Sequence, residues 1–240
     1  MNTVILDARP RSAYDAGHVE GAIHADLDTQ LSAKGDPSKG GRHPLPPVER
    51  WIAQLREWGI TPSTRVIVYD DTNGANAAAR AWWMLRAIGH EHVEVIDRDA
   101  AIPPASHAAT SAWSDDWQWP TVAIEDVDRL RTDPNWRVLD VRSGERYRGE
   151  TEPIDPIAGH IPGAINLPYT ENIGKSPEEI RAMYAELLGD VPPERLVVHC
   201  GSGVTACQTL LALDRAGLPG ASLYVGSWSE WCRTDFLAVG

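Results

Sequence analysis

Short apolar segments alternate with longer segments of helical pattern along most of the chain. The stretches 65–70 (RVIVYD) and 195–199 (RLVVH) are apolar runs of strand length. After a short loop, each is followed by a segment of helical length, at 77–89 and at 204–217. Strands that alternate with helices of about a dozen residues are typical of a parallel sheet covered on both faces.

One of the helical segments carries the end signals of a helix. Ser176 is a suitable N-cap, Pro177 fits the first turn, and Glu179 follows three residues after the cap. The segment stops at Gly189, where a helix end favours a residue in the left-handed conformation. We therefore predict a capped helix between Ser176 and Gly189.

A repeat divides the chain into two similar halves. LDAR at 6–9 is followed by GHVEGAI at 17–23, and LDVR at 139–142 is followed by GHIPGAI at 159–165. Five of the seven residues in the second block are identical, and each copy continues with helix, strand, loop, helix and strand. The sequence thus predicts two tandem α/β domains, each a parallel sheet flanked by helices.

Composition indicates where the two domains meet. The segment 101–120 is rich in Pro, Ala, Ser and Asp, which is typical of a linker. We therefore expect a first domain at 1–100 and a second at 121–240. The second copy has a lead-in, 122–140, that the first copy lacks, so the first is expected to be a shortened domain.

Composition and charge argue against several classes of partner. The 240 residues carry a formal net charge of −12, which opposes a nucleic-acid backbone. No apolar run approaches the roughly 20 residues of a membrane helix, and the start has no basic segment before a long apolar one. We expect a soluble cytoplasmic protein without nucleic-acid or membrane partners. Three cysteines are too few for a disulfide framework or a four-ligand zinc site, and we expect neither metal nor cofactor.

The stretch VVHCGSGVTA at 197–206 is the most informative local pattern. The strand ends on Cys200, at the sheet edge where open α/β proteins bind ligands. The following helix presents unsatisfied N–H groups, and Gly201 and Gly203 allow the loop to turn such groups toward one sulfur. Such surroundings favour a reactive thiolate. The alternative is a buried structural cysteine, the interpretation we prefer for Cys207 and Cys232.

The two copies differ at the residue that would react. When the strands are aligned, Asp70 of the first copy stands opposite Cys200 of the second. A carboxylate cannot act as a sulfur nucleophile. We therefore expect an inactive first domain in a supporting role.

Together these features resemble the two-domain rhodanese, or sulfurtransferase, family. The resemblance rests on the paired LDxR and GHxxGA segments, VHCGSGVTA, RAWWMLRAIGH at 80–90 and YVGSWSEW at 224–231. It implies two rhodanese-like domains, the second of them catalytic. It also implies that the Cys200 thiolate takes sulfur from a small donor as a persulfide. The acceptor would be cyanide or a thiol, including that of a thioredoxin-like protein.

The residues after the cysteine bear on the donor. Thiosulfate-using members carry basic residues there, whereas this chain has the uncharged Gly201 and Ser202. The neutral loop is similar to that of 3-mercaptopyruvate sulfurtransferases; thiosulfate:cyanide sulfur transfer is the alternative. The resemblance implies a relay of Ser202, His18 and Asp7 that protonates the pyruvate fragment. The same GH and LD pairs recur in the second copy, so a structural role for His18 and Asp7 stays open.

The segment DVRSGERYRGE at 140–150 is similar to the family's donor-binding region. The resemblance implies that Arg146 holds the anionic group of the donor, with Arg142 beside it. Ordinary ion pairs are the alternative for both arginines. The same resemblance places the substrate against loop residues Gly201, Gly203, Val204 and Thr205.

One departure concerns a second arginine that mercaptopyruvate enzymes carry before the GH motif. Asp155 stands near that place here. Arg42 or His43, in GGRHPLP, could compensate, and an ordinary solvated loop is the alternative.

Two rival functions are disfavoured. A tyrosine-type phosphatase needs an arginine six residues after its cysteine, where this chain has Ala206. A non-catalytic interaction module would be expected to lose the thiol, yet Cys200 is present.

Overall fold

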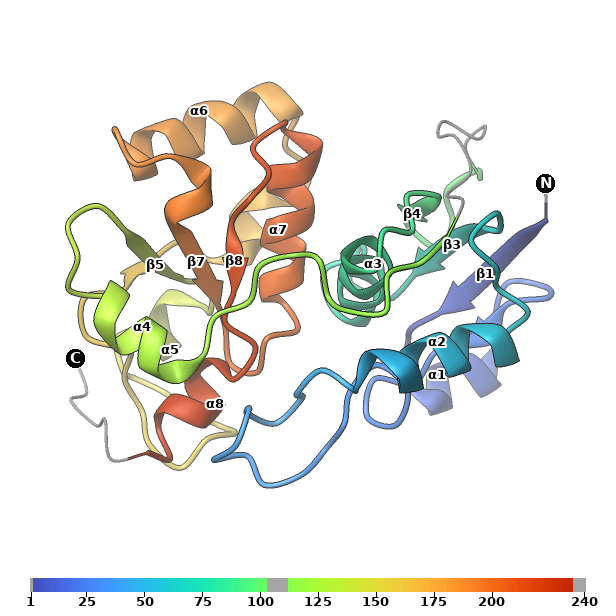
Figure 1. Cartoon of the computed structure of the whole chain (residues 1–240), viewed down its shortest axis with the longest axis horizontal. Coiled ribbons are helices and arrows are strands. Elements are labelled where there is room, and N and C mark those ends of the chain that lie inside the picture. Colours follow the sequence, from blue (N-terminus) through green and yellow to red (C-terminus); the bar gives the residue numbers. More distant parts are fainter. Residues whose placement is uncertain (1, 103–111, 235–240) are drawn as a thin grey trace. The chain divides into compact units, whose positions relative to one another are not determined.

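The computed structural model describes residues 2–102 and 112–234. They form two compact units (Figure 1). The first comprises Met1–Ala33 and Leu45–Trp119, and the second comprises Lys34–Pro44 and Pro120–Gly240. The part of the expected linker at 103–111 lies outside the described residues.

The first unit is a four-stranded parallel sheet with flanking helices. The strands pair in the order β2-β1-β3-β4, all parallel. In chain order, its elements are β1 (Thr3–Asp7), α1 (Arg11–Ala16), β2 (Ile23–His24), α2 (Val48–Glu57), β3 (Arg65–Tyr69), α3 (Ala77–Ala87) and β4 (Val93–Val95). Helix α2 buries Val48, Trp51, Ile52 and Leu55, the spacing of a single helical face.

The second unit repeats this sheet, with the strand order β6-β5-β7-β8 and parallel pairing throughout. It begins with α4 (Ile124–Leu130), β5 (Arg137–Asp140), α5 (Gly144–Tyr147), β6 (Ile165–Asn166) and the 3-10 turn η1 (Tyr169–Asn172). It continues with α6 (Pro177–Leu188), η2 (Pro193–Arg195), β7 (Leu196–His199), α7 (Ala206–Arg215), β8 (Ser222–Leu223) and α8 (Ser227–Trp231). The predicted class, two tandem domains with parallel sheets, is confirmed.

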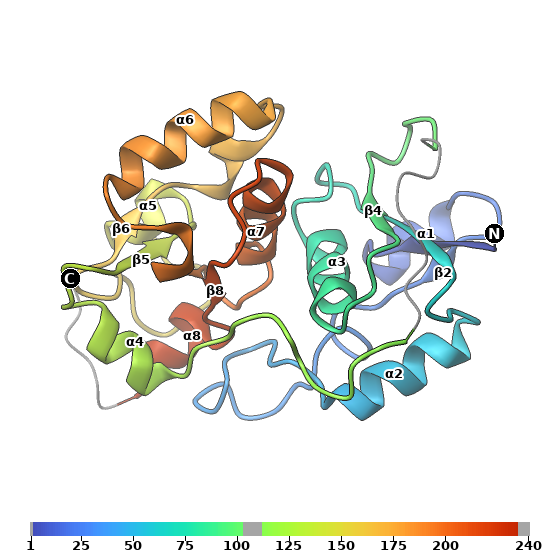
Figure 2. The same ribbon diagram turned by 45° about the horizontal axis from the view of Figure 1, so that its top comes forward.

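Helices cover both faces of the second sheet (Figure 2). Side chains alternate along a strand, so Val138 and Val197 face one core, which α4 and α8 complete with Val127, Trp228 and Trp231. On the other face α7 packs against β7, and α6 packs against α7.

The capping box predicted for α6 is present. Glu179 N donates to Ser176 Oγ at 3.3 Å, and Ser176 N donates to the Glu179 carboxylate at 2.8 Å. Gly189 closes the helix with a φ of 58°, in the left-handed region.

Both sheets place a carboxylate at the carboxyl edge of their central strands. Asp7 pairs in register with Tyr69, and Asp140 pairs with His199. The next residues are Asp70 and Cys200, so the two loops compared in the sequence begin at equivalent edges.

No helix among the described residues is long and apolar enough to cross a lipid bilayer.

Candidate active site

Cys200 directly follows β7, and the residue is only 2% exposed. A six-residue connection leads from β7 to α7, which begins at Ala206. The thiol therefore lies at the start of the loop that joins the strand to the N-terminus of α7. Helix N-termini favour negative charge.

Helix α8 fixes the orientation of the Cys200 loop. Trp228 N donates to Cys200 O at 3.0 Å, and Ser229 N donates to Gly201 O at 2.9 Å. In a trans peptide the N–H points opposite to the preceding C=O, so the N–H groups of Gly201 and Ser202 point away from α8. This contribution of the YVGSWSEW segment is a finding that the sequence pattern did not indicate.

Several loop N–H groups are available to an anion. Within residues 2–102 and 112–234, no acceptor is recorded for the N–H groups of Gly201, Ser202, Val204 and Thr205. Buried backbone N–H groups are almost always paired. A persulfide or thiolate sulfur beside them would supply the missing acceptor.

The two glycines of the loop serve different purposes. Gly203 has a φ of +73°, and a Cβ there would collide with the carbonyl oxygen of Val225, so no other residue fits. Gly201 has no such backbone requirement. A Cβ on it would lie 3.3 Å from Nη2 of both Arg146 and Arg42. Gly201 therefore leaves room for two guanidinium groups.

Ser227 holds the backbone of Cys200 in place through hydrogen bonds. Its Oγ accepts from Cys200 N at 3.2 Å and donates to Tyr224 O at 2.9 Å. Ser227 itself has a φ of 55°, a region that is costly for a residue with a side chain. Such strain at the site agrees with a functional role, and no sequence signal would have identified it.

Ser202 is hydrogen-bonded to a histidine that the sequence interpretation had not paired with it. His43 Nδ1 lies 2.9 Å from Ser202 Oγ. His43 belongs to the 34–44 segment, which lies within the first repeat in sequence but groups with the second unit. The motif GGRHPLP was the one available signal for this contact.

His18 and Asp7 have local partners in the first unit. His18 Nδ1 lies 3.0 Å from Tyr14 O, and its ring stacks on the Tyr14 ring at 3.9 Å. In the second unit His160 makes the same contacts with Tyr147, at 2.8 Å and 3.9 Å. This matching favours a structural role for His18.

Asp7 is fully buried and accepts from Arg9 Nη2 at 2.6 Å and from Tyr69 Oη at 2.7 Å. Burial opposes its ionisation, yet these hydrogen bonds hold the pKa of Asp7 below the usual value. Asp140 pairs with Arg142 in the same geometry, also at 2.6 Å. The relay through His18 and Asp7 stays a prediction, and the contacts of both residues are those of a repeated structural motif.

The two arginines predicted to bind the donor differ in their free N–H groups. Arg142 donates to Asp140, Glu152 and the carbonyl oxygen of Gly159, and its guanidinium lies 4.8 Å from the Trp228 ring centroid. Arg142 is 3% exposed and engages Nε, Nη1 and Nη2, and these contacts favour the alternative of an ion-paired, structural arginine. Arg146 has a side chain 19% exposed and reaches the space over Gly201.

Val204 and Thr205 form the turn that leads into α7. Val204 O accepts from Cys207 N at 3.0 Å, and Thr205 O accepts from Gln208 N at 3.1 Å. The N–H groups of both residues have no acceptor among the described residues, and the predicted contact of these residues with the donor stays a prediction.

In the first unit, the side chain of Asp70 occupies the corresponding loop. Asp70 Oδ1 accepts from Thr72 N at 2.9 Å and from Gly74 N at 2.8 Å. Asp70 Oδ2 accepts from Asn76 N at 3.0 Å and from Ala78 N at 3.1 Å. The loop thus binds an anion, and that anion is the carboxylate of Asp70.

The remaining cysteines, Cys207 and Cys232, are both buried. Cys207 donates to Gly203 O at 3.4 Å. Burial, reinforced by the charge of Asp155, raises the pKa of the Cys232 thiol. Both features agree with structural roles.

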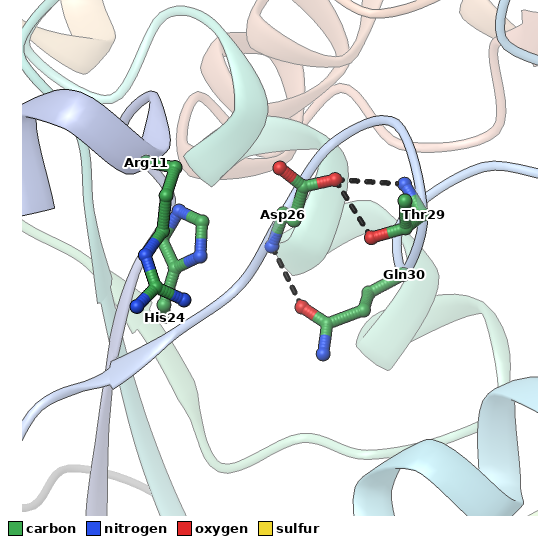
Figure 3. A pocket seen from close by; sticks show the side chains of 5 residues that line it. All are labelled: Arg11, His24, Asp26, Thr29 and Gln30. Carbon is green, nitrogen blue, oxygen red and sulfur yellow. Dashed lines mark hydrogen bonds between the residues drawn. The ribbon is translucent and has the colours of Figure 1, made fainter.

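A separate pocket of about 340 Å³ lies in the first unit and is lined by Arg11, His24, Asp26, Thr29 and Gln30 (Figure 3). Asp26 Oδ1 accepts from Thr29 N at 2.8 Å, and Asp26 N donates to Gln30 Oε1 at 2.8 Å. Asp26, Thr29 and Gln30 are thus bonded to one another, whereas Arg11 pairs with Asp15 and His24 contacts the carbonyl oxygen of Arg9.

Comparison with known proteins gives a consistent result across sequence and structure. A family model described as Rhodanese-like domain matches residues 1–99 and 123–234. A Pseudomonas aeruginosa protein named "Probable 3-mercaptopyruvate sulfurtransferase" is 42% identical over 234 residues, covering 91% of this chain and 82% of its own. Human 3-mercaptopyruvate sulfurtransferase is 35% identical over 239 residues, covering 92% and 79%. The structure of the Leishmania major 3-mercaptopyruvate sulfurtransferase matches with a TM-score of 0.76 and 30% identity, covering 96% of this chain and 70% of that one.

Proposed function

The chain belongs to the rhodanese family and is a sulfurtransferase, and we propose that its donor is 3-mercaptopyruvate and its sulfur carrier is Cys200. The observation that carries this proposal is the Cys200 loop, in which the N–H groups of Gly201, Ser202, Val204 and Thr205 have no acceptor among the described residues and the two residues after the cysteine are uncharged. A thiosulfate dianion would gain more from basic residues at those two positions.

In the proposed first step, the Cys200 thiolate attacks the sulfur of 3-mercaptopyruvate. A sulfur–sulfur bond forms, the carbon–sulfur bond breaks, and its electron pair moves into the enolate of pyruvate. A proton must then reach the methylene carbon to give pyruvate. The persulfide left on Cys200 carries negative charge, which the N–H groups of Gly201, Ser202, Val204 and Thr205, without acceptors among the described residues, would stabilise.

In the second step, an acceptor thiolate attacks the outer sulfur of the persulfide. The new bond forms to the acceptor, and the electron pair of the old bond returns to Cys200 as a thiolate. We propose a thiol acceptor, with thioredoxin-like proteins among the candidates. Cyanide would accept the same sulfur as thiocyanate.

We assign the proton of the first step to Ser202 and His43. The supporting contact is the hydrogen bond of 2.9 Å between His43 Nδ1 and Ser202 Oγ, beside the nucleophile. An imidazole can pass a proton through the serine hydroxyl to the enolate carbon. This assignment gives His43 the part that the sequence comparison suggested for His18.

His43→Gln is expected to lower turnover of 3-mercaptopyruvate by about 100-fold, because general acid catalysis is worth at least that much. Turnover of thiosulfate should change little, since sulfite leaves without protonation at carbon. His18→Ala is the matched control and should keep most of the activity. If His18→Ala loses 3-mercaptopyruvate turnover and His43→Gln retains it, the proton relay includes His18 and not His43.

The donor itself is tested with the unmodified protein. Rates of thiocyanate formation in the presence of cyanide are compared for 3-mercaptopyruvate and thiosulfate over a range of donor concentrations. We expect a larger kcat/KM for 3-mercaptopyruvate, with pyruvate released in equal amount. A larger value for thiosulfate would identify the protein as a thiosulfate sulfurtransferase instead.

A further inference from the structure

The aspartate of each LDxR motif is held by the same arginine contacts. In the first unit, Asp7 accepts from Arg9 Nε at 3.0 Å and from Arg9 Nη2 at 2.6 Å. In the second unit, Asp140 accepts from Arg142 Nε at 3.1 Å and from Arg142 Nη2 at 2.6 Å. The surroundings of the two carboxylates can therefore be compared atom by atom.

The turn after each GH pair is also the same in both units. Val19 O accepts from Ala22 N at 2.9 Å, and Ile161 O accepts from Ala164 N at 2.9 Å. Val19 and Ile161 each follow the histidine of their GH pair. The N–H groups of these two residues thus hold equivalent positions.

In the first unit, one tyrosine hydroxyl joins the carboxylate to this turn. Tyr69 Oη donates to Asp7 Oδ2 at 2.7 Å and accepts from Val19 N at 3.1 Å. Because both groups are bonded to the same oxygen atom, the hydroxyl satisfies a carboxylate and a backbone N–H together.

The second unit has His199 at the position of Tyr69, since each pairs in register with the aspartate of its motif. An imidazole is shorter than a phenol, and His199 Nε2 lies 4.0 Å from Asp140 Oδ2, which is too far for a hydrogen bond. His199 and Ile161 are both fully buried. Within the part of the chain that the structure describes, neither His199 Nε2 nor Ile161 N has a hydrogen-bond partner. Buried groups of both kinds are almost always paired.

The hydrogen-bonding capacity of these groups matches one water molecule. His199 Nδ1 lies 3.2 Å from Cys200 O, which can only accept, so the ring proton is on Nδ1 and Nε2 is an acceptor. Burial lowers the pKa of His199 more than the charge of Asp140 raises it, which keeps the ring neutral near pH 7. The groups thus comprise one donor, Ile161 N, and two acceptors. Two hydrogen bonds of about 2.8 Å that meet at one oxygen span the 4.0 Å between the acceptors.

The same histidine acts on the peptide group that follows Cys200. Cys200 O accepts from Trp228 N at 3.0 Å and faces His199 Nδ1 at 3.2 Å. The N–H of Gly201 belongs to this peptide and points the opposite way. Two donors on the carbonyl oxygen therefore fix the direction of one of the N–H groups of the nucleophile loop.

We propose that a buried water molecule bridges Ile161 N, Asp140 Oδ2 and His199 Nε2. It accepts from the backbone N–H and donates one hydrogen to the carboxylate and one to the imidazole, as a buried water with about three partners does. Its oxygen takes the place of the Tyr69 hydroxyl of the first unit. The water holds His199 in the tautomer that donates to Cys200 O, so His199 is a positioning residue for the nucleophile. This positioning role rests on the proposed function, in which Cys200 carries the sulfur.

A high-resolution crystal structure of the unmodified protein tests the water directly. We expect one ordered water within about 3.2 Å of Ile161 N, Asp140 Oδ2 and His199 Nε2. In a crystal structure of His199→Tyr, the phenol hydroxyl should replace this water. If Ile161 N instead donates directly to His199 Nε2 and no water contacts the three groups, the proposal is wrong.

Thermal unfolding compares His199→Tyr with His199→Phe, which differ by one hydroxyl. The tyrosine can pair with Asp140 and Ile161, whereas the phenylalanine displaces the water and leaves both without a partner. We expect the Tm of His199→Phe to be lower by roughly 4 to 10 °C, the usual effect of one or two unpaired buried polar groups in a chain of this size. Tyr69→Phe removes the same hydroxyl from the first unit and is the matched control. Equal Tm values for the two His199 variants would overturn the bridge.

Turnover separates positioning from stability. His199→Tyr restores the bridge but cannot donate to Cys200 O, whereas the amide of His199→Asn can donate from the position of Nδ1 but is too short to reach the water. With 3-mercaptopyruvate and cyanide, kcat is expected to fall about 5- to 10-fold in His199→Tyr, the value of one hydrogen bond. It should fall less in His199→Asn, although this variant has the lower Tm. Turnover that follows the order of the Tm values would overturn the positioning role. Absence of turnover in the unmodified protein would instead contradict the proposed function, which the crystal structure does not test.

Discussion

Cys200→Ser is expected to abolish sulfur loading and to lower turnover by a factor on the order of 10⁴ or more, as for other enzymes that lose their nucleophile. A serine hydroxyl is similar in size but stays protonated near neutral pH, and it cannot carry a sulfane sulfur. The loop N–H groups and the support from Ser227 would remain in place. The loss would therefore report on the sulfur atom itself and not on the fold.

Mass spectrometry after exposure to 3-mercaptopyruvate measures this directly. The unmodified protein should gain one sulfur atom, and Cys200→Ser should gain none. Cys207→Ala is the control, because Cys207 lies on α7 and its thiol donates to Gly203 O. Equal labelling of Cys200→Ser and the unmodified protein would show that Cys200 is not the sulfur carrier.

Asp70→Ala is expected to destabilise the first unit by about 3–5 kcal/mol, the usual loss when a buried charge that satisfies several partners is removed. Asp70 is 3% exposed, and four backbone N–H groups of its loop would lose their acceptor. Asp70→Asn keeps one of the two carboxylate oxygens, so a smaller loss is expected. Asparagine has nearly the same volume as aspartate. A loss of stability in Asp70→Asn that is smaller than in Asp70→Ala would therefore report on lost hydrogen bonds and not on a cavity.

Urea denaturation monitored by tryptophan fluorescence checks this expectation, because several tryptophans, including Trp82 and Trp83 of α3, are buried in the first unit. The midpoint of the transition should fall strongly for Asp70→Ala. Asp71→Ala provides the control, since Asp71 is the next residue and is exposed. A midpoint equal to that of the unmodified protein would show that the loop does not depend on its internal anion.

The elements of the fold follow closely from local patterns in the sequence. The strand before Cys200, the helix after it and the capped helix α6 were predictable, because apolar spacing and end signals such as Ser176 and Glu179 of α6 act over a few residues. The repeat then showed that the two sheets have the same plan. The equivalence of Asp70 and Cys200 could be read from that repeat before the structure of either loop was known.

The environment of the nucleophile was much harder to predict, since it is built from segments distant in the chain. His43 contacts Ser202 across 159 positions, and Arg42 contacts Asp155 across 113. No periodicity or motif spacing encodes such contacts. The sequence did single out Arg42 and His43, but only through a likeness to a segment near the family's cleft. Conversely, the GH motif that led to the prediction for His18 makes matching contacts in both repeats, which favours a structural role.

The grouping of residues 34–44 with the second unit has a consequence for the ancestry of the chain. The repeat in the sequence indicates that the chain arose by duplication of one unit. Here, residues numbered within the first half contribute His43 and Arg42 beside the thiol of the second. A gene divided between the repeats would encode one product without a sulfur nucleophile and another without these two side chains, so the halves can now be inherited only as a pair.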